Sequence, residues 1–352
     1  MSCSTNTIDQ MQLLARLKTR ARELGFDRIG IAPATASLYR DYFRRWLDGG
    51  QAGEMKYLGQ RLQQRTDPAA YLPGAVSVIC AAVNYHVPLQ EPAAQEASHH
   101  GRIARYALGE DYHDWLKRRL HALADWLREA APAAQTRFCT DTAPVMEKEL
   151  AARAGIGWLG KNCCVINEQI GSWLFLGEIV TTLALPADEA AVDRCGSCRR
   201  CIDACPTQAI TEPYRLDARR CISYLSIEHR GAIDPELAEK FGAWIYGCDI
   251  CQEVCPWNRE APAAGGSELQ PRFATGTVDA RELLNWTQQD YRRHLRGSAM
   301  KRAKLPMLKR NAQIALQNLE ANGMDEKAGR AQRAARPATV TKMSVNPTVR
   351  RP

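Results

Sequence analysis

Apolar residues recur at helical spacing in three stretches of the first half of the chain, which predicts three amphipathic helices. These stretches cover residues 8–24, 111–131 and 145–156. Gly155 stands near the end of the last one, where a glycine C-cap would close the helix. The helices would each bury one apolar face against a neighbouring element.

Three other stretches are apolar without helical spacing and are bounded by turn residues, which predicts strands. They cover residues 26–33, 73–85 and 172–185. Helices and strands therefore alternate without a fixed order. This pattern indicates an α/β domain of mixed order over residues 1–185.

The second half of the chain has a different organisation. Residues 186–265 form a cysteine-rich module, which runs into the proline- and glycine-rich linker NREAPAAGGSELQP. The chain then becomes helical over 266–323, and residues 304–323 are similar to one helix of a HEAT-type repeat. Residues 324–352 form a basic tail whose composition predicts disorder. We therefore predict an α+β multidomain protein with a C-terminal α-helical, HEAT-like segment.

Eight of the 13 cysteines lie between residues 195 and 255. The first run, CGSCRRCIDACP, has the C-x2-C-x2-C-x3-C-P spacing of bacterial 4Fe–4S clusters, in which the fourth cysteine ligates the other cluster of a pair. The second run, CDICQEVCP, has one thiol fewer, and Cys221 makes up the number. Eight thiolates complete two clusters, so residues 186–265 are predicted to be a two-cluster, ferredoxin-like domain.

Exchange of the fourth ligand divides the eight thiolates into two sets. The first cluster set is Cys195, Cys198, Cys201 and Cys255. The second cluster set is Cys205, Cys221, Cys248 and Cys251. Neither cluster can form unless the two cysteine runs pack together.

Zinc and disulfides are the competing interpretations of these cysteines. Structural zinc sites use separated C-x2-4-C pairs and have no role for a third cysteine followed by C-P. Disulfides require an oxidising compartment, and the chain shows no export signal. The other five cysteines are expected to be free thiols: Cys3, Cys80, Cys139, Cys163 and Cys164.

The net charge of +8 is concentrated near the C-terminus. Residues 291–310 carry eight Lys/Arg and no acid, interleaved with apolar residues at helical spacing. Such a run is either a solvated surface or a site for a polyanion, with nucleic acid the first candidate.

No apolar segment of about 18 residues and no signal-peptide core are visible in the sequence. We therefore predict a cytoplasmic protein that does not associate with membranes, and we expect it to be a monomer.

Several segments together resemble the epoxyqueuosine reductases, a family related to cobalamin-dependent reductive dehalogenases. The segments are RYALGEDYHDWLK, DTAPVMEKELAARAGIGWLGKN, GSWLFLGEI, CISYLSIE, GCDICQEVCPWN and GSAMKRAKLPMLKRN. The resemblance implies that the N-terminal domain binds a cobalamin without a lower ligand from the protein, and that the chain holds two 4Fe–4S clusters. It also implies reduction of the epoxide of epoxyqueuosine at the tRNA wobble position to queuosine, with electrons from an external low-potential donor.

The resemblance assigns roles to individual residues. Asp141 is expected to be the proton donor, with its pKa raised by burial; from the residues alone, an N-cap of the following helix would be the favoured role. The expected cobalamin contacts are Arg65, Tyr106, Asp141, Val165, Leu176, Ser223, Cys248 and Asp249. Arg65 could instead be a surface salt-bridge partner. The expected tRNA contacts are Arg292, Arg293, Arg296, Lys301, Arg302, Lys304, Lys309 and Arg310.

Two other functions compete with epoxyqueuosine reduction as interpretations of the sequence. A corrinoid and iron–sulfur reductase of a small molecule, as in a reductive dehalogenase, is disfavoured by the basic C-terminal segment and the missing export signal. A simple electron carrier is disfavoured by the roughly 185 residues that precede the cysteine module. The cobalamin motif D-x-H-x-x-G is also absent, because the similar DYHDWL has Leu116 in place of the glycine.

Overall fold

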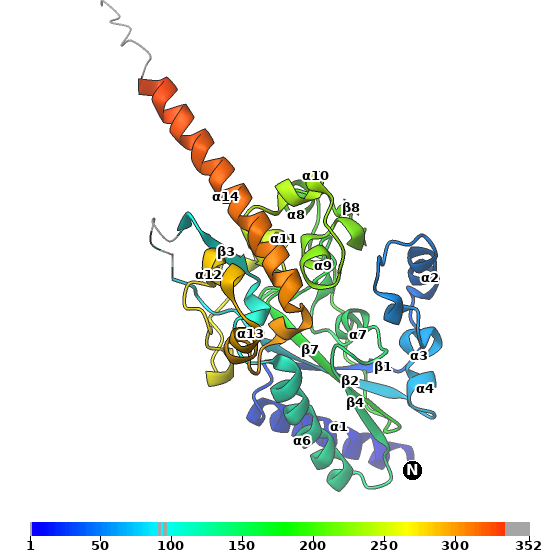
Figure 1. Ribbon diagram of the computed structural model, residues 1–352. Helices are drawn as coiled ribbons and strands as arrows, with labels where there is room; N and C mark the ends of the chain where they lie inside the picture. The colour runs from blue at the N-terminus through cyan, green and yellow to red at the C-terminus, as the bar shows by residue number, and fades with distance from the viewer. Residues whose placement is uncertain (1, 91–92, 94–96, 335–352) are drawn as a thin grey trace, which may run out of the picture.

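The computed structural model describes residues 2–90, 93 and 97–334. A four-stranded, wholly antiparallel sheet in the order β1-β2-β7-β4 forms the centre of the N-terminal half. Its strands are β1 (Arg28–Pro33), β2 (Ser77–Asn84), β7 (Leu174–Thr181) and β4 (Thr136–Cys139). The three strands predicted from the sequence are β1, β2 and β7, whereas β4 was not predicted. Figure 1 shows this sheet between helices.

Each face of the sheet has its own apolar core. In β2, Ile79, Ala81 and Val83 face the core formed with α1 (Ser2–Glu23) and α6 (Tyr112–Ala130). Val78, Cys80 and Ala82 face the opposite core, which includes α7 (Glu147–Arg153). Successive side chains of a strand point to opposite faces, so a continuously apolar strand indicates burial on both sides. The helix predictions at 8–24, 111–131 and 145–156 correspond to α1, α6 and α7.

A second sheet joins the three predicted segments of the chain. Its order is β10-β3-β11, with β3 (His100–Ile103) parallel to β10 (Trp244–Tyr246) and antiparallel to β11 (Thr277–Asp279). These strands come from the N-terminal half, the cysteine module and the helical segment, respectively. The three segments are therefore connected through backbone hydrogen bonds, and none of these strands was predicted.

The cysteine module consists of short elements that turn the thiols inward. Its two cysteine runs contain α8 (Arg200–Asp203) and α11 (Ile250–Glu253), which contact each other. The remaining elements of the module are β8 (Ile210–Glu212), β9 (Arg215–Leu216), η3 (Ala218–Arg220), α9 (Ile222–Ile227), α10 (Pro235–Ala238), η4 (Glu239–Phe241) and η5 (Pro256–Asn258).

The basic segment at 291–310 is not one helix. It includes the end of α13 (Gln288–His294), the 3-10 turn η7 (Ala299–Arg302) and the start of α14 (Leu305–Ala334). α14 packs against α12 (Ala280–Asn285) and then extends away from the body of the molecule (Figure 1). The prediction of a disordered tail from residue 324 is wrong for 324–334, which are helical, and residues 335–352 lie outside the described part.

The other elements are short and frame the site. They are α2 (Arg40–Asp48), η1 (Lys56–Leu58), α3 (Leu62–Thr66), α4 (Pro68–Tyr71), η2 (Arg105–Ala107), β5 (Trp158–Leu159), β6 (Val165–Ile166) and η6 (Ser267–Leu269). No helix in the described ranges is long and apolar enough to cross a membrane.

Candidate active site

A cavity of about 150 Å³ lies between the central sheet and the second cysteine run. Its apolar wall comes from β6 and the start of β7, and its polar wall comes from the loop after β4 and the start of α7. The lining residues are Tyr85, Tyr112, Asp141, Glu147, Lys148, Cys164, Val165, Ser172, Leu174, Phe175, Leu176 and Gln252. One side of the cavity is therefore suited to a flat apolar group and the other to proton transfer.

Three of the eight expected cobalamin contacts line this cavity, namely Asp141, Val165 and Leu176. The other five are not among the lining residues. Asp249 is 2% exposed and its carboxylate accepts the backbone N–H of Arg105 at 2.7 Å, which is a structural role. Burial raises the pKa of Asp249 to about 7.

Four more of the expected contacts, Tyr106, Ser223, Cys248 and Arg65, do not line the cavity. Tyr106 contacts the ring of Tyr112, a lining residue, edge to face, with ring centroids 6.2 Å apart. Ser223 lies in α9, two residues after Cys221, and Cys248 belongs to the predicted second cluster set.

Asp141 lies on the loop between β4 and α7 and has a positive φ of 39°. This left-handed conformation is uncommon outside glycine, although aspartate tolerates it better than most residues. The N-cap of α7 is Met146, so Asp141 does not cap that helix. Its side chain is 50% exposed, which contradicts the expectation that burial would prepare it for proton donation.

A histidine links two carboxylates at this loop. His113 Nδ1 is 2.7 Å from Asp111 Oδ1, and His113 Nε2 is 3.0 Å from Asp141 Oδ2. Burial disfavours the imidazolium, but the hydrogen bonds to Asp111 and Asp141 outweigh this effect and raise the pKa of His113 to about 9. His113 therefore carries a proton at neutral pH, directly beside Asp141.

Glu147 provides a second acidic group at the same place. Its Oε2 accepts the backbone N–H of Asp141 at 3.2 Å. Burial and the Asp141 carboxylate raise the pKa of Glu147, so it retains a proton more readily than an ordinary glutamate.

Arg65 lies within electrostatic reach of the Asp141 and Glu147 carboxylates, and its buried Nε has no hydrogen-bond partner among the described residues. No ion pair of Arg65 is found among the described residues, and whether it contacts cobalamin remains a prediction.

The structure brings the cysteines together in the two predicted sets. A second cavity, of about 360 Å³, is lined by all four thiols of the first cluster set, Cys195, Cys198, Cys201 and Cys255. In the second set, burial and the nearby thiols of Cys221 and Cys205 raise the pKa of Cys248. The assignment of each thiol to a cluster remains a prediction, and this proximity supports it.

The small cavity borders the second cluster set. Cys164 lines the cavity and is hydrogen bonded to Cys251 of that set. Gln252 lines it as well and accepts the hydroxyl hydrogen of Ser172 at 2.9 Å. A reducible group in the cavity would therefore lie next to the second cluster.

The eight expected tRNA contacts differ in whether their side chains already bind other groups of the protein. Arg310 donates to the backbone carbonyls of Leu225, His229 and Gly231, so its role is structural. Arg302 forms a two-pronged ion pair with Glu228 at 2.8 Å, and Arg293 pairs with Asp290 at 2.7 Å. Acids therefore accompany the basic segment, although residues 291–310 contain none.

Four of the other cations form an exposed basic surface. We define it by Arg292, Arg296, Lys301 and Lys304. Within the part of the chain that the structure describes, none of the four has an ion-pair partner. Lys309 is half-buried on α14.

Sequence reasoning missed several site residues, and two of them had a visible signal. His113 occurs in DYHDWL, the segment that resembles an incomplete cobalamin motif. Glu147 occurs six residues after Asp141 in DTAPVMEKEL. The contribution of Tyr85 and Gln252 depends on how distant segments pack, and no local pattern indicates it.

Comparisons with known proteins give a consistent result. A 4Fe–4S double cluster binding domain model matches residues 194–258, and a model described as "Epoxyqueuosine reductase QueG, DUF1730" matches residues 65–142. An epoxyqueuosine reductase of Pseudomonas aeruginosa is 40% identical over 313 residues, which is 88% of this chain and 86% of that protein. One from Gloeobacter violaceus is 42% identical over 309 residues, covering 86% of this chain and 95% of the relative.

Solved structures agree. A crystal structure of epoxyqueuosine reductase with an epoxyqueuosine-modified tRNA-Tyr stem loop has a TM-score of 0.82 at 30% identity, covering 88% of this chain and 82% of that one. The Bacillus subtilis enzyme, with its catalytic aspartate loop swung out of the active site, also has a TM-score of 0.82, at 29% identity and with 93% and 87% coverage.

Replacing Cys255 by serine is expected to damage the first cluster, although Cys255 belongs to the second cysteine run. Anaerobically reconstituted protein should hold about eight irons, since two cubanes fit eight thiolates, and the variant should lose up to about half of them. Iron analysis and electron paramagnetic resonance measure this. Cys80→Ser, a buried thiol outside both sets, is the matched control. An unchanged first-cluster signal in Cys255→Ser would disprove the assignment.

His113 is expected to make stability depend on pH. Its pKa is about 9 in the folded chain and about 6.5 in an unfolded one, so its stabilising effect is complete below pH 6.5 and is lost as the pH rises through 9. The melting temperature of His113→Asn should therefore lie below that of the wild type at pH 6.5 and approach it by pH 9.5. A gap that stays constant over this range would rule out the raised pKa.

Proposed function

The chain belongs to the epoxyqueuosine reductase family, and on this premise we propose that it reduces the epoxide of epoxyqueuosine in the tRNA anticodon to queuosine. The observation that carries the proposal is the small cavity, where Asp141, hydrogen bonded to the protonated His113, faces an apolar wall beside the second cluster set. A structural relative that holds the modified tRNA stem loop supports the substrate.

Residues 194–258 are a two-cluster 4Fe–4S domain, and the cavity beside it, at about 150 Å³, is too small for a whole cobalamin but would take part of one face of its ring. Val165, Leu174 and Leu176 offer an apolar surface to a corrin ring. When bound, the cobalamin would supply a strongly reducing centre, while the chain supplies position and protons.

The residues of the chain would provide the protons that the reduction consumes. Conversion of an epoxide to an alkene and water requires two electrons and two protons. Asp141 faces the cavity and would protonate the departing oxygen, and His113 at 3.0 Å would restore the proton. Glu147, with its raised pKa, is a second proton source next to Asp141.

The basic surface would position the tRNA. Its cations would contact backbone phosphates and fix the register of the anticodon loop, whose wobble base turns out towards the cavity. This surface also disfavours the alternative of a small-molecule reductase, because a small halogenated substrate does not need it.

Replacing Asp141 by asparagine is expected to lower turnover by roughly 10²- to 10⁴-fold, the usual contribution of general acid catalysis. Iron content and the cobalamin spectrum should stay unchanged, because Asp141 ligates neither. Mass spectrometry of the wobble nucleoside follows loss of the oxygen. Asp114→Asn, an exposed carboxylate next to His113 in the chain, is the control. Retention of more than about a tenth of the activity in Asp141→Asn would exclude the assigned role.

Replacing Arg292, Lys301 and Lys304 together by alanine is expected to weaken tRNA binding and its salt dependence. Each phosphate contact contributes roughly 0.7–0.9 to the slope of log affinity against log salt, so the slope should fall by about two to three. Filter binding at several salt concentrations measures it. The control replaces Lys117, Arg118 and Arg128 on α6. An unchanged slope in the first variant would show that the basic surface is only solvated.

A further inference from the structure

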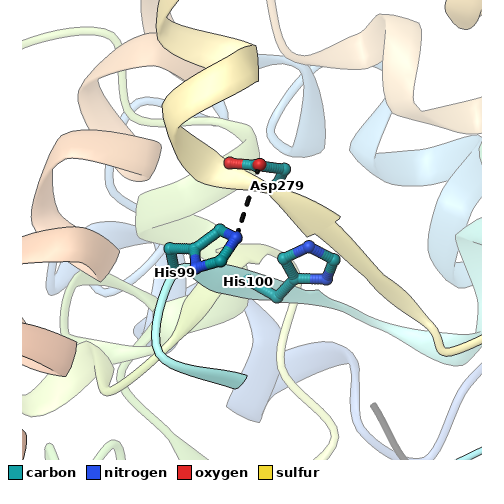
Figure 2. A group of neighbouring side chains, drawn as sticks. All are labelled: His99, His100 and Asp279. Carbon is teal, nitrogen blue, oxygen red and sulfur yellow. Dashed lines mark ion pairs between the residues drawn. The ribbon is translucent and has the colours of Figure 1, made fainter. Parts of the chain in front are cut away.

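Two histidines and an aspartate converge where β3 meets β11, and none of the three lines the cavity described above. His99, His100 and Asp279 each offer a ligand atom, and these atoms lie within 4.8 Å of one another (Figure 2). They are the one such group among the residues that the structure describes. His100 and Asp279 are directly opposite in the antiparallel ladder, so their side chains share a face of the sheet.

Both imidazoles are already held by their Nδ1 atoms. His100 Nδ1 is 3.1 Å from Thr277 Oγ1, and His99 Nδ1 is 3.2 Å from Ser98 Oγ. A hydrogen bond at one ring nitrogen fixes the orientation of the ring and leaves the other nitrogen as the ligand, which is the usual arrangement of metal-binding histidines. The two Nε2 atoms are therefore the ones available to an ion.

The two carboxylate oxygens of Asp279 likewise have different roles. Its Oδ1 accepts the backbone N–H groups of Arg281 and Glu282 at 2.8 and 3.1 Å and thereby caps α12. Its Oδ2 is 3.6 Å from His99 Nε2, which is too long for a hydrogen bond. Two ligands of a tetrahedral zinc, each at about 2.0–2.2 Å, lie roughly 3.4 Å apart, so this separation suits an ion between them.

We propose that His99, His100 and Asp279 bind one divalent transition-metal ion, for which zinc is the probe. Two imidazole nitrogens and one carboxylate oxygen match the ligands of zinc, whereas magnesium and calcium prefer oxygen alone. Water completes the coordination, since the group is partly exposed.

The ion would connect two parts of the chain. β3 leads directly to Arg105 and Tyr106 beside the active site, and β11 leads into α12 of the helical segment. An ion held by both strands stabilises their pairing in the folded state alone, so the melting temperature should rise with zinc concentration.

Untagged holoenzyme with both clusters loaded is dialysed against radioactive zinc, and the zinc absorption edge is recorded. One zinc should bind, with nitrogen and oxygen neighbours at about 2.0–2.1 Å and none of the sulfur neighbours at about 2.3 Å that a cysteine site would give. Iron and cobalt absorb at other energies and do not interfere. Zinc held by sulfur, or no bound zinc, would overturn the proposal.

Variants test the three ligands separately from the fold. His100→Ala and Asp279→Asn should abolish the site, with iron content unchanged. Thr277→Val keeps a β-branched strand residue but removes the partner of His100, and it should weaken binding roughly 10- to 100-fold. His121→Ala is the control, because His121 has only one carboxylate partner, Asp125 at 2.9 Å. Equal zinc affinity in Thr277→Val and the wild type would count against the site.

Discussion

The division of ligands between the two cysteine runs is the constraint on which the rest of the structure depends. In the predicted assignment, Cys255 completes the set of Cys195, Cys198 and Cys201, with which it lines one cavity, and Cys205 joins the set of Cys248, to which it lies near. The second cysteine run must therefore pack on the first, and α8 contacts α11 accordingly. The same packing places Cys251 beside Cys164, and so brings the second cluster set to the edge of the cavity.

Electrostatics explains why proton donation can occur on a half-exposed loop. An isolated aspartate at the surface is ionised at neutral pH and is a poor acid. Here Asp141 has two titratable neighbours. His113 holds a proton between Asp111 and Asp141, and Glu147 accepts the backbone N–H of Asp141. Hydrogen bonds to the two aspartates raise the pKa of His113, and burial together with the Asp141 carboxylate raises the pKa of Glu147. The proton supply thus belongs to the cluster rather than to one buried residue.

The sequence allowed prediction of those features that local patterns encode. Helical spacing located α6, apolar runs located β2 and β7, and cysteine spacing suggested two sets of thiols whose proximity in the structure supports the grouping. It did not reveal β3, β10 and β11, because each is short and gains its stability only by pairing with strands from distant segments. Which cations of residues 291–310 pair with acids could not be predicted for a similar reason. Glu228, the partner of Arg302, is distant in sequence and adjacent only in the fold.

The arrangement of clusters and cavity is tested most directly by electron paramagnetic resonance of the holoenzyme with cobalt(II) cobalamin and partly reduced clusters. The account predicts magnetic interaction between the cobalt and the second cluster, because Cys164, which lines the cavity, is hydrogen bonded to Cys251 of the second cluster set. The interaction should disappear in Cys221→Ser and persist in Cys255→Ser. A cobalt signal free of any interaction, or one coupled to a cluster that only Cys255→Ser removes, would contradict it.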